Sequence, residues 1–369
     1  MKVSLAIRPA PPLPGDTTHP VKTMQATRVM RNRVSIRPPL VGCECGHDDC
    51  VTPNEWKGLP RGHFRQPQRS GLPTLPGLCA AVQAHAWKST TTVVHKQGGK
   101  IFVQFMHCGR VAHVDNLPAG AEVLGPGTTV CPGEMYTDAR GLQPHSPPRA
   151  MTSDDIAQVI DEHVAAAKLA LDAGFDGVEL HGANGYLIEQ FLNPLVNQRT
   201  DGYGGSVERR NRLALEIARA TVAAIGRDRV GMRLSPYGVF NGTGAFPDVQ
   251  AQYLTLVHSL SVLGLLYVHL VDHSSMGAPP VPADFKLQLR TAFDGLFILS
   301  GGFDHASAEQ ALLDKRGDLV AFGRPFLANP DLVARLRKDA PLNAADEATF
   351  YTPGAKGYTD YPGLAIQAA

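Results

Sequence analysis

Short apolar runs recur along the chain from Ile101 onward and predict buried β-strands. They are rich in Val, Ile, Leu and Phe and carry few charged residues. A continuous apolar run indicates a strand that is covered on both faces, as in a parallel sheet, whereas alternation would indicate a strand with one exposed face. The runs lie at residues 101–106, 177–180, 230–234, 265–271, 296–299 and 319–322.

Amphipathic segments of helical length separate these runs, and a glycine that can end a helix follows three of them. Strands that alternate with helices predict an α/β fold, and six such units with an N-terminal remainder predict a (β/α)8 TIM barrel. The first two strands of that barrel are poorly supported by the sequence. We expect a single domain over residues 1–369, with helices at residues 153–173, 207–225, 248–263 and 307–313.

The composition narrows the class of partner. Hydrophobic residues make up 43% of the 369 residues, and the net charge is +1, which gives no excess of positive charge for nucleic acid or an anionic membrane surface. No apolar run has the length of a membrane-spanning helix, and the first 24 residues do not resemble a signal peptide. The six cysteines suit a reducing compartment. We therefore expect a cytoplasmic protein that acts on a small molecule.

The second apolar run ends in a group of residues suited to catalysis. His181, Asn184 and Tyr186 follow the strand, with two glycines between them that allow a sharp turn. His181 and Asn184 can both donate hydrogen bonds to one oxygen, and Tyr186 carries a phenolic proton. The alternative interpretation is that all three are loop residues that bond to their own backbone.

Further polar or glycine residues lie at the ends of other predicted strands. Gln104 is in the first run and Arg233 is near the end of the third. The carboxyl ends of the strands carry catalysis in β/α barrels, and the loops after the seventh and eighth strands commonly bind a phosphate. Two glycine turns with an arginine would suit that phosphate, and they contain Gly301, Gly302, Gly323 and Arg324.

From about residue 98 to 363 the chain resembles the old yellow enzyme family of FMN-dependent NADPH:ene-reductases. The likeness is strongest to the bacterial branch that includes N-ethylmaleimide and nitrate-ester reductases. The motifs that carry the resemblance are FVQFMHCGR at 102–110, HGANGYL at 181–187, RTDGYGGS at 199–206, RLSP at 233–236, SGGF at 300–303, AFGRPF at 321–326 and FYTPGAKGYTDYP at 350–362.

The resemblance implies a reaction as well as a fold. Non-covalent FMN, reduced by NADPH, would transfer hydride to the β-carbon of an α,β-unsaturated carbonyl or nitro compound, and nitrate esters are a further substrate class. His181 and Asn184 would polarise the substrate oxygen, and Tyr186 would protonate the α-carbon. Gln104 and Arg233 would bind the pyrimidine edge of the flavin, and Gly301, Gly302, Gly323 and Arg324 its phosphate. Met106 and Tyr351 would line the substrate pocket.

The resemblance fails between residues 36 and 80. This stretch is rich in proline and glycine and has no helical or alternating apolar period. A shifted reading frame and a divergent loop both remain open as explanations, and we expect the stretch to be disordered and to weaken FMN binding. Cys43, Cys45, His47 and Cys50 have the side chains of a zinc site, but their spacing is not that of a standard one, so we predict no metal.

Alternative functions remain open at this point. One is another flavin-dependent barrel oxidoreductase of the dienoyl-CoA reductase type, although such relatives usually continue into a cysteine-rich segment that the sequence does not show. A second is an inactive or flavin-free product with a compromised barrel. A barrel acting on a phosphorylated sugar is a third, but it gives Gln104, Arg233 and Tyr186 no reason to converge. The resemblance implies a monomer or a homodimer.

Overall fold

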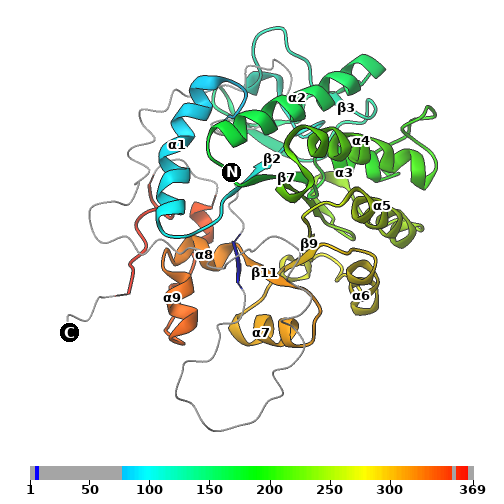
Figure 1. The fold of residues 1–369 in the computed structure, drawn as a ribbon. Coiled ribbons are helices and arrows are strands. Elements are labelled where there is room, and N and C mark those ends of the chain that lie inside the picture. The colour runs from blue at the N-terminus through cyan, green and yellow to red at the C-terminus, as the bar shows by residue number, and fades with distance from the viewer. Residues whose placement is uncertain (1–4, 8–76, 351–354, 365–369) are drawn as a thin grey trace.

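The computed structural model describes residues 5–7, 77–350 and 355–364. The expectations for residues 36–76, and for Tyr351, lie outside the described residues. A sheet of seven strands forms the centre of the described part, in the order β1-β11-β10-β9-β8-β7-β2. Helices surround this sheet (Figure 1). Its strands are β1 (Leu5–Ile7), β2 (Phe102–Phe105), β7 (Gly177–Gly182), β8 (Val230–Leu234), β9 (Tyr267–Val271), β10 (Leu296–Ser300) and β11 (Leu319–Phe322).

All six predicted strands are present, and each pairs in parallel with the next along the chain. Every residue of β7, β8 and β9 is buried, which explains why the sequence reads there as continuous apolar runs. The predicted α/β class and the parallel arrangement are therefore confirmed for this part of the chain.

The described strands do not by themselves make the expected eight-stranded barrel. The parallel strands number six, and β2 and β11 form the two ends of their series. The short strand β1 pairs with β11 in the antiparallel direction, so it is not one of the two parallel strands that a (β/α)8 barrel still requires. Closure of the barrel would have to involve residues outside the described part.

The predicted helices are present, and the structure adds several that the sequence pattern did not predict. The sequence also has a weak helical pattern at residues 86–95, and this stretch lies within α1, which begins five residues earlier. The helix α6 was not predicted. The helices are α1 (Ala81–Lys96), α2 (Ser153–Asp172), α3 (Leu187–Leu192), α4 (Val207–Ile225), α5 (Val249–Leu263), α6 (Ala283–Thr291), α7 (His305–Leu313), α8 (Arg324–Ala328) and α9 (Leu332–Arg337).

The helix α1 packs firmly against the following βα unit although it begins at the edge of the described residues. Its Trp87 meets Phe175 edge to face, with ring centroids 5.6 Å apart. Thr91 donates a hydrogen bond of 2.7 Å to the carbonyl of Ala173, at the C-terminal end of α2. These contacts place the chain before β2 in the position that a helix of the β/α series requires.

A small irregular region between β2 and α2 stands beside the carboxyl ends of the strands. It contains the antiparallel hairpin of β4 (Glu134–Thr137) and β5 (Gly141–Pro144), and the short parallel pair of β3 (Leu124–Gly125) and β6 (Arg149–Ala150). Met135 of the hairpin packs with Val111 and Cys131, and Tyr186 packs against this cluster. The hairpin region therefore supports one side of the predicted catalytic tyrosine.

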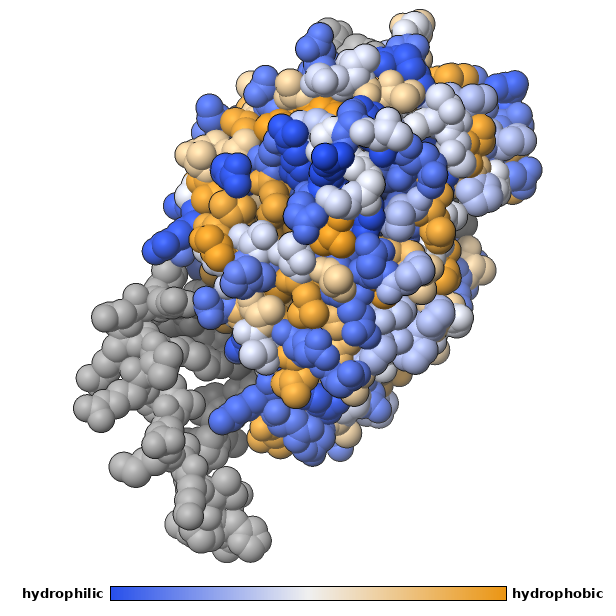
Figure 2. Space-filling model, turned by 90° about the vertical axis from the view of Figure 1, so that its right-hand side faces the viewer, coloured by the Kyte–Doolittle hydropathy of each residue, from blue (hydrophilic) through white to orange (hydrophobic). Residues whose placement is uncertain are grey.

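The outer surface is mixed in polarity. On the side where α4, α5 and α6 lie, hydrophilic and hydrophobic residues are interspersed (Figure 2). None of the helices in the described ranges is long and apolar enough to cross a membrane.

Candidate active site

The register of the sheet places predicted site residues of neighbouring strands beside one another, in two successive layers along the strand direction. In the first, Gln104 of β2 is the register partner of Glu179 on β7. In the second, His181 of β7 pairs with Arg233 of β8, which in turn pairs with His269 of β9. Because paired residues of a parallel sheet point to the same face, the predicted catalytic histidine and the predicted flavin-binding arginine are direct neighbours.

The turn after β7 brings two of the predicted catalytic side chains into contact. Asn184 has φ 59° and Gly185 has φ 74°, so two successive left-handed residues reverse the chain before α3. The rings of His181 and Tyr186 meet edge to face with centroids 5.1 Å apart. The sequence prediction that these two side chains share one site is therefore supported by their geometry.

Asn184 is fixed through its backbone, which leaves its side chain available. Its N–H donates to Oγ of Ser235 at 2.9 Å, and its carbonyl accepts from Nδ2 of Asn241 at 2.7 Å. Within the described ranges the buried Oδ1 of the Asn184 amide has no hydrogen-bond partner. An amide held in position without a partner suits the binding of a polar group that the protein does not itself supply.

A buried glutamate supports this turn from below. Glu189 of α3 accepts from the N–H of Gly185 at 2.5 Å, from Ser235 Oγ at 2.9 Å and from Tyr253 Oη at 3.0 Å. Burial raises the pKa of Glu189 to about 7, although all three hydrogen bonds favour the ionised form. Ser235 connects Glu189 to the Asn184 backbone, so one network holds the whole turn.

A second buried network lies beside Gln104 and Arg233. Glu179 accepts from Nε2 of Gln104 at 2.5 Å and from Nδ1 of His269 at 3.0 Å, and Nε2 of His269 lies 3.0 Å from Ser300 Oγ. Burial alone would raise the pKa of Glu179, but His269, the charge of Arg233 and the Gln104 amide outweigh it and lower the pKa to about 2. Glu179 is therefore ionised at neutral pH.

Arg233 is a buried cation whose Nε lacks an acceptor among the described residues. The residue is 8% exposed, and its Nε is buried with no hydrogen-bond partner in the part of the chain that the structure describes. Burial lowers its pKa, while the charge of Glu179 opposes that shift. A buried N–H group without an acceptor is costly, and this position fits an electron-rich ligand such as the pyrimidine ring of a flavin.

The glycine turns after β10 and β11 also come together. A Cβ on Gly301, where φ is 123°, would lie 1.9 Å from the Asp272 carbonyl oxygen, so the backbone there approaches too closely for any side chain. A Cβ on Gly302 would lie 2.8 Å from Cβ of Ser275, and Nη2 of Arg324 lies 3.5 Å from Oγ of the same serine. The turns after three successive strands thus meet at Ser275.

This corner of the structure has the features of a phosphate site. Gly302 and Gly323 are exposed, and a Cβ on Gly323 would meet no heavy atom of the described residues within 4 Å. In the part of the chain that the structure describes, the partly exposed guanidinium of Arg324 has a long contact of 3.3 Å to Glu347 Oε1 besides its contact with Ser275. Open backbone amides beside an available arginine fit an anion. Together with Gln104 and Arg233, the residues present therefore fit FMN.

The remaining predicted residue in the described part, Met106, is half-buried and follows Gln104 by two positions. Met106 comes directly after the last residue of β2, at the carboxyl end of that strand. This agrees with its predicted place in the substrate pocket but does not test it.

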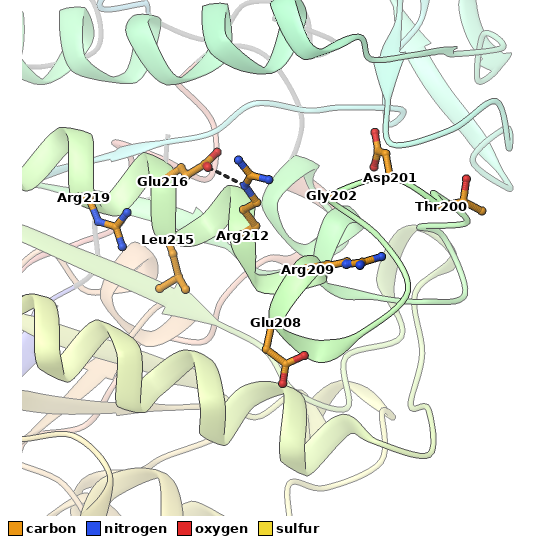
Figure 3. A pocket seen from close by; sticks show the side chains of 9 residues that line it. All are labelled: Thr200, Asp201, Gly202, Glu208, Arg209, Arg212, Leu215, Glu216 and Arg219. Carbon is orange, nitrogen blue, oxygen red and sulfur yellow. Dashed lines mark hydrogen bonds and ion pairs between the residues drawn. The ribbon is translucent and has the colours of Figure 1, made fainter.

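A surface hollow of about 750 Å³ lies elsewhere, on the exposed side of α4 and the loop before it. Three arginines, Arg209, Arg212 and Arg219, line it together with acidic side chains, and Arg212 is paired with Glu216 at 2.8 Å (Figure 3). None of the predicted site residues that the structure describes lines this hollow, so it is separate from the candidate active site.

Glu179, His269 and Glu189 were not predicted as site residues. Glu179 and His269 lie inside runs that we interpreted as apolar strands, and Glu189 lies in a short helix. The signal that was available is a titratable residue in the middle of an otherwise apolar strand, because such a residue must find a partner in the interior.

The comparisons with known proteins identify the class to which this fold and site belong. The sequence model of the NADH:flavin oxidoreductase / NADH oxidase family matches residues 61–343. The chain is 41% identical over 298 residues to 12-oxophytodienoate reductase 2 of Arabidopsis thaliana. This alignment covers 80% of this chain and 79% of that protein. It is 42% identical over 305 residues to 12-oxophytodienoate reductase 1 of Oryza sativa subsp. japonica, covering 81% and 78% respectively.

A solved structure agrees with the sequence relatives. Morphinone reductase in complex with tetrahydroNAD has a TM-score of 0.77 at 38% sequence identity, with 82% of this chain and 83% of that chain covered. The chain therefore belongs to the old yellow enzyme family of FMN-dependent oxidoreductases, and it is of the ene-reductase type. The family match begins at residue 61, inside the stretch 36–80 that we interpreted as divergent.

Proposed function

We propose that this protein reduces the activated C=C bond of α,β-unsaturated carbonyl or nitro compounds, with NADPH as the reductant, and that nitrate esters are a second substrate class. FMN, reduced by the nicotinamide, supplies the hydride to the β-carbon. The observation that carries the proposal is the contact between His181 and Tyr186 beside the register partner Arg233. This contact brings together a donor for the substrate oxygen (His181), a proton donor (Tyr186) and a cation beside the flavin (Arg233).

His181 and Asn184 bind the carbonyl or nitro oxygen in this proposal. Both can donate hydrogen bonds, His181 through a ring N–H and Asn184 through its amide NH2 group. Donors aimed at an oxygen that gains negative charge stabilise the transition state more than the ground state. The left-handed turn at Asn184 and Gly185, tied to Glu189, keeps these donors in place before the substrate binds.

Tyr186 supplies the proton to the α-carbon. Its side chain is half-buried and lies against His181 and the cluster of Val111, Cys131 and Met135. The Arg233 charge also reaches the Tyr186 hydroxyl. A positioned phenol that lies near cationic or donor groups is a suitable general acid, because its conjugate base is stabilised there.

Gln104 and Arg233 hold the pyrimidine end of FMN, and Gly301, Gly302, Gly323 and Arg324 hold its phosphate. The support for this assignment is the buried Arg233 Nε, which has no acceptor among the residues that the structure describes, and the convergence of the glycine turns at Ser275. Met106 lines the substrate side, and Tyr351 is proposed to do so from the resemblance alone. A small-molecule partner, a cytoplasmic location and a monomeric or dimeric state remain predictions.

The two half-reactions test this function separately. The FMN-loaded protein is mixed without oxygen with NADPH or NADH, and loss of the flavin absorbance is followed. The reduced protein is then mixed with 2-cyclohexenone, a nitroalkene or a nitrate ester, and return of the absorbance is followed. We expect NADPH to reduce the protein faster than NADH does. The enone should reoxidise the reduced protein and should itself be converted to the saturated ketone. Reoxidation no faster than in buffer alone for all three substrates would contradict the proposal.

A further inference from the structure

Glu179 is a buried carboxylate at the centre of β7 that the proposed reaction does not use. The residue is 4% exposed. It is nevertheless surrounded by polar groups from three other strands, because Gln104, Arg233 and His269 all face it. Tyr267 completes this set, and burial followed by the negative charge of Glu179 raises its pKa well above the ordinary value. A buried charge with this many partners is retained at a cost and requires a role.

The first consequence of Glu179 is the orientation of the Gln104 amide. An ionised carboxylate can only accept hydrogen bonds, so the amide must turn its NH2 group towards Glu179, as it does at 2.5 Å. The carbonyl Oε1 of Gln104 is thereby directed away from Glu179. It is available to accept from an N–H group, and the flavin pyrimidine ring carries one such imide group between two carbonyls.

The second consequence concerns charge. Arg233 and Glu179 lie on neighbouring strands and act on each other, and within the described ranges the guanidinium Nε has no hydrogen-bond partner. The electrostatic potential beside Arg233 is therefore set by one positive and one negative charge that partly cancel. Both charges are buried, so the protein interior screens them only weakly. His269 does not add a third fixed charge, because burial lowers its pKa and its Nδ1–H serves Glu179.

We propose that Glu179 is a positioning residue that sets both the hydrogen-bond polarity and the net charge at the pyrimidine end of bound FMN, acting through Gln104 and Arg233. Reduction adds negative charge to that end of a flavin, so a negative group nearby lowers the reduction potential. This inference rests on the FMN binding of the proposed function and assigns the tuning of the cofactor to a residue that does not itself need to touch it.

The test measures the reduction potential and the FMN affinity of the full-length protein. Glu179→Gln keeps the size of the side chain and removes its charge. We expect the potential of bound FMN to rise by about 30 mV, which corresponds to a tenfold change in the ratio of affinities for reduced and oxidised flavin. The matched control is Glu189→Gln, the same substitution at a second buried glutamate of the same βα unit, whose partners are Ser235, Tyr253 and Gly185. Its potential should equal that of the unmodified protein.

A second variant separates orientation from charge. Glu179→Asp keeps the charge but withdraws the carboxylate from Gln104, so we expect FMN affinity to fall about tenfold while the potential stays close to that of the unmodified protein. If circular dichroism shows that Glu179→Gln is unfolded, the FMN affinity of Glu179→Asp tests the inference instead. An unchanged potential in folded Glu179→Gln, or an unchanged affinity in Glu179→Asp, would overturn the inference. An unmodified protein that binds no FMN would instead overturn the proposed function on which it rests.

Discussion

Tyr186 and His181 meet edge to face, with ring centroids 5.1 Å apart. His181 lies near the end of β7, and Tyr186 is the N-cap residue of α3. Two left-handed residues between them make this contact possible. The arrangement places a proton donor beside an oxygen-binding donor, which the reduction of a conjugated C=C bond requires. The predictions below test each part of this arrangement.

Replacement of the proton donor should affect only one half-reaction. In Tyr186→Phe we expect reoxidation by 2-cyclohexenone to slow by about 100-fold, because a general acid contributes roughly that much or more. Flavin reduction by NADPH should change less than about threefold, because it needs no proton from this residue. Stopped-flow absorbance measures both rates. Tyr136→Phe, at an exposed tyrosine of β4, is the control. Equal losses in both half-reactions would remove Tyr186 from this role.

Removal of an oxygen-binding donor should weaken ligand binding. We expect His181→Ala and Asn184→Ala each to raise the Kd of a phenol about tenfold, because each loses roughly one hydrogen bond to a partly charged oxygen. Titration followed by the flavin absorbance gives the Kd. His258→Ala, on the exposed side of α5, is the control and should bind as the unmodified protein does. A phenol Kd unchanged in both variants would show that the ligand oxygen lies elsewhere.

The pKa of Glu189 predicts a pH dependence of stability. Burial raises this pKa from its ordinary value of 4.5 to about 7, so the folded state holds a proton that the unfolded state releases. The contribution of Glu189 is most favourable below pH 4.5, falls as the pH rises to about 7, and is constant above that. The fall amounts to about 3 kcal/mol. Thermal unfolding between pH 5 and 8 should show it.

Glu189→Gln should remove this dependence, because a neutral amide replaces the titrating group. The difference in free energy of unfolding between the variant and the unmodified protein should then move in favour of the variant as the pH rises. A difference that stays constant from pH 5 to 8 would mean that Glu189 is ionised throughout, with its charge balanced by the Gly185, Ser235 and Tyr253 donors.

The two glycine turns should respond differently to alanine. Gly301→Ala must displace the Asp272 carbonyl and adopt φ near 123°, so we expect a loss of more than about 2 kcal/mol in the free energy of unfolding. Gly323 has φ −102° and open space around its Cα. Gly323→Ala should therefore change stability by less than about 0.5 kcal/mol but weaken FMN binding, because the methyl group occupies the proposed phosphate position. Urea unfolding and FMN titration distinguish the two effects. Unchanged FMN affinity in Gly323→Ala would contradict the phosphate assignment.

The sequence predicted those parts of the fold that depend on local pattern. Strands such as Val230–Leu234 are buried on both faces, so their apolar runs were visible, and helices such as α4 ended at the expected glycine. The sequence could not give the register, and it is the register that makes Arg233 the neighbour of His181. Glu179 was missed for a related reason, because its partners come from other strands.

The N-terminal part of the barrel shows where pattern fails. Residues 36–80 carry no period from which strands could be predicted. The one described strand near the N-terminus, β1 at Leu5–Ile7, lies before this stretch and runs antiparallel to β11. The family match nevertheless includes the chain from residue 61. Since a β/α barrel needs all its strands to hold a cofactor at their carboxyl ends, cofactor binding is the property on which the whole account depends.

The visible absorbance spectrum of the purified protein, recorded after desalting and again after incubation with excess FMN and a second desalting, tests that property most directly. We predict a retained flavin spectrum, shifted from that of free FMN because Arg233 and Gln104 surround the pyrimidine end of the ring. A protein that retains no flavin in either case would contradict the account. It would show that the catalytic residues are present in a chain that does not form the cofactor site.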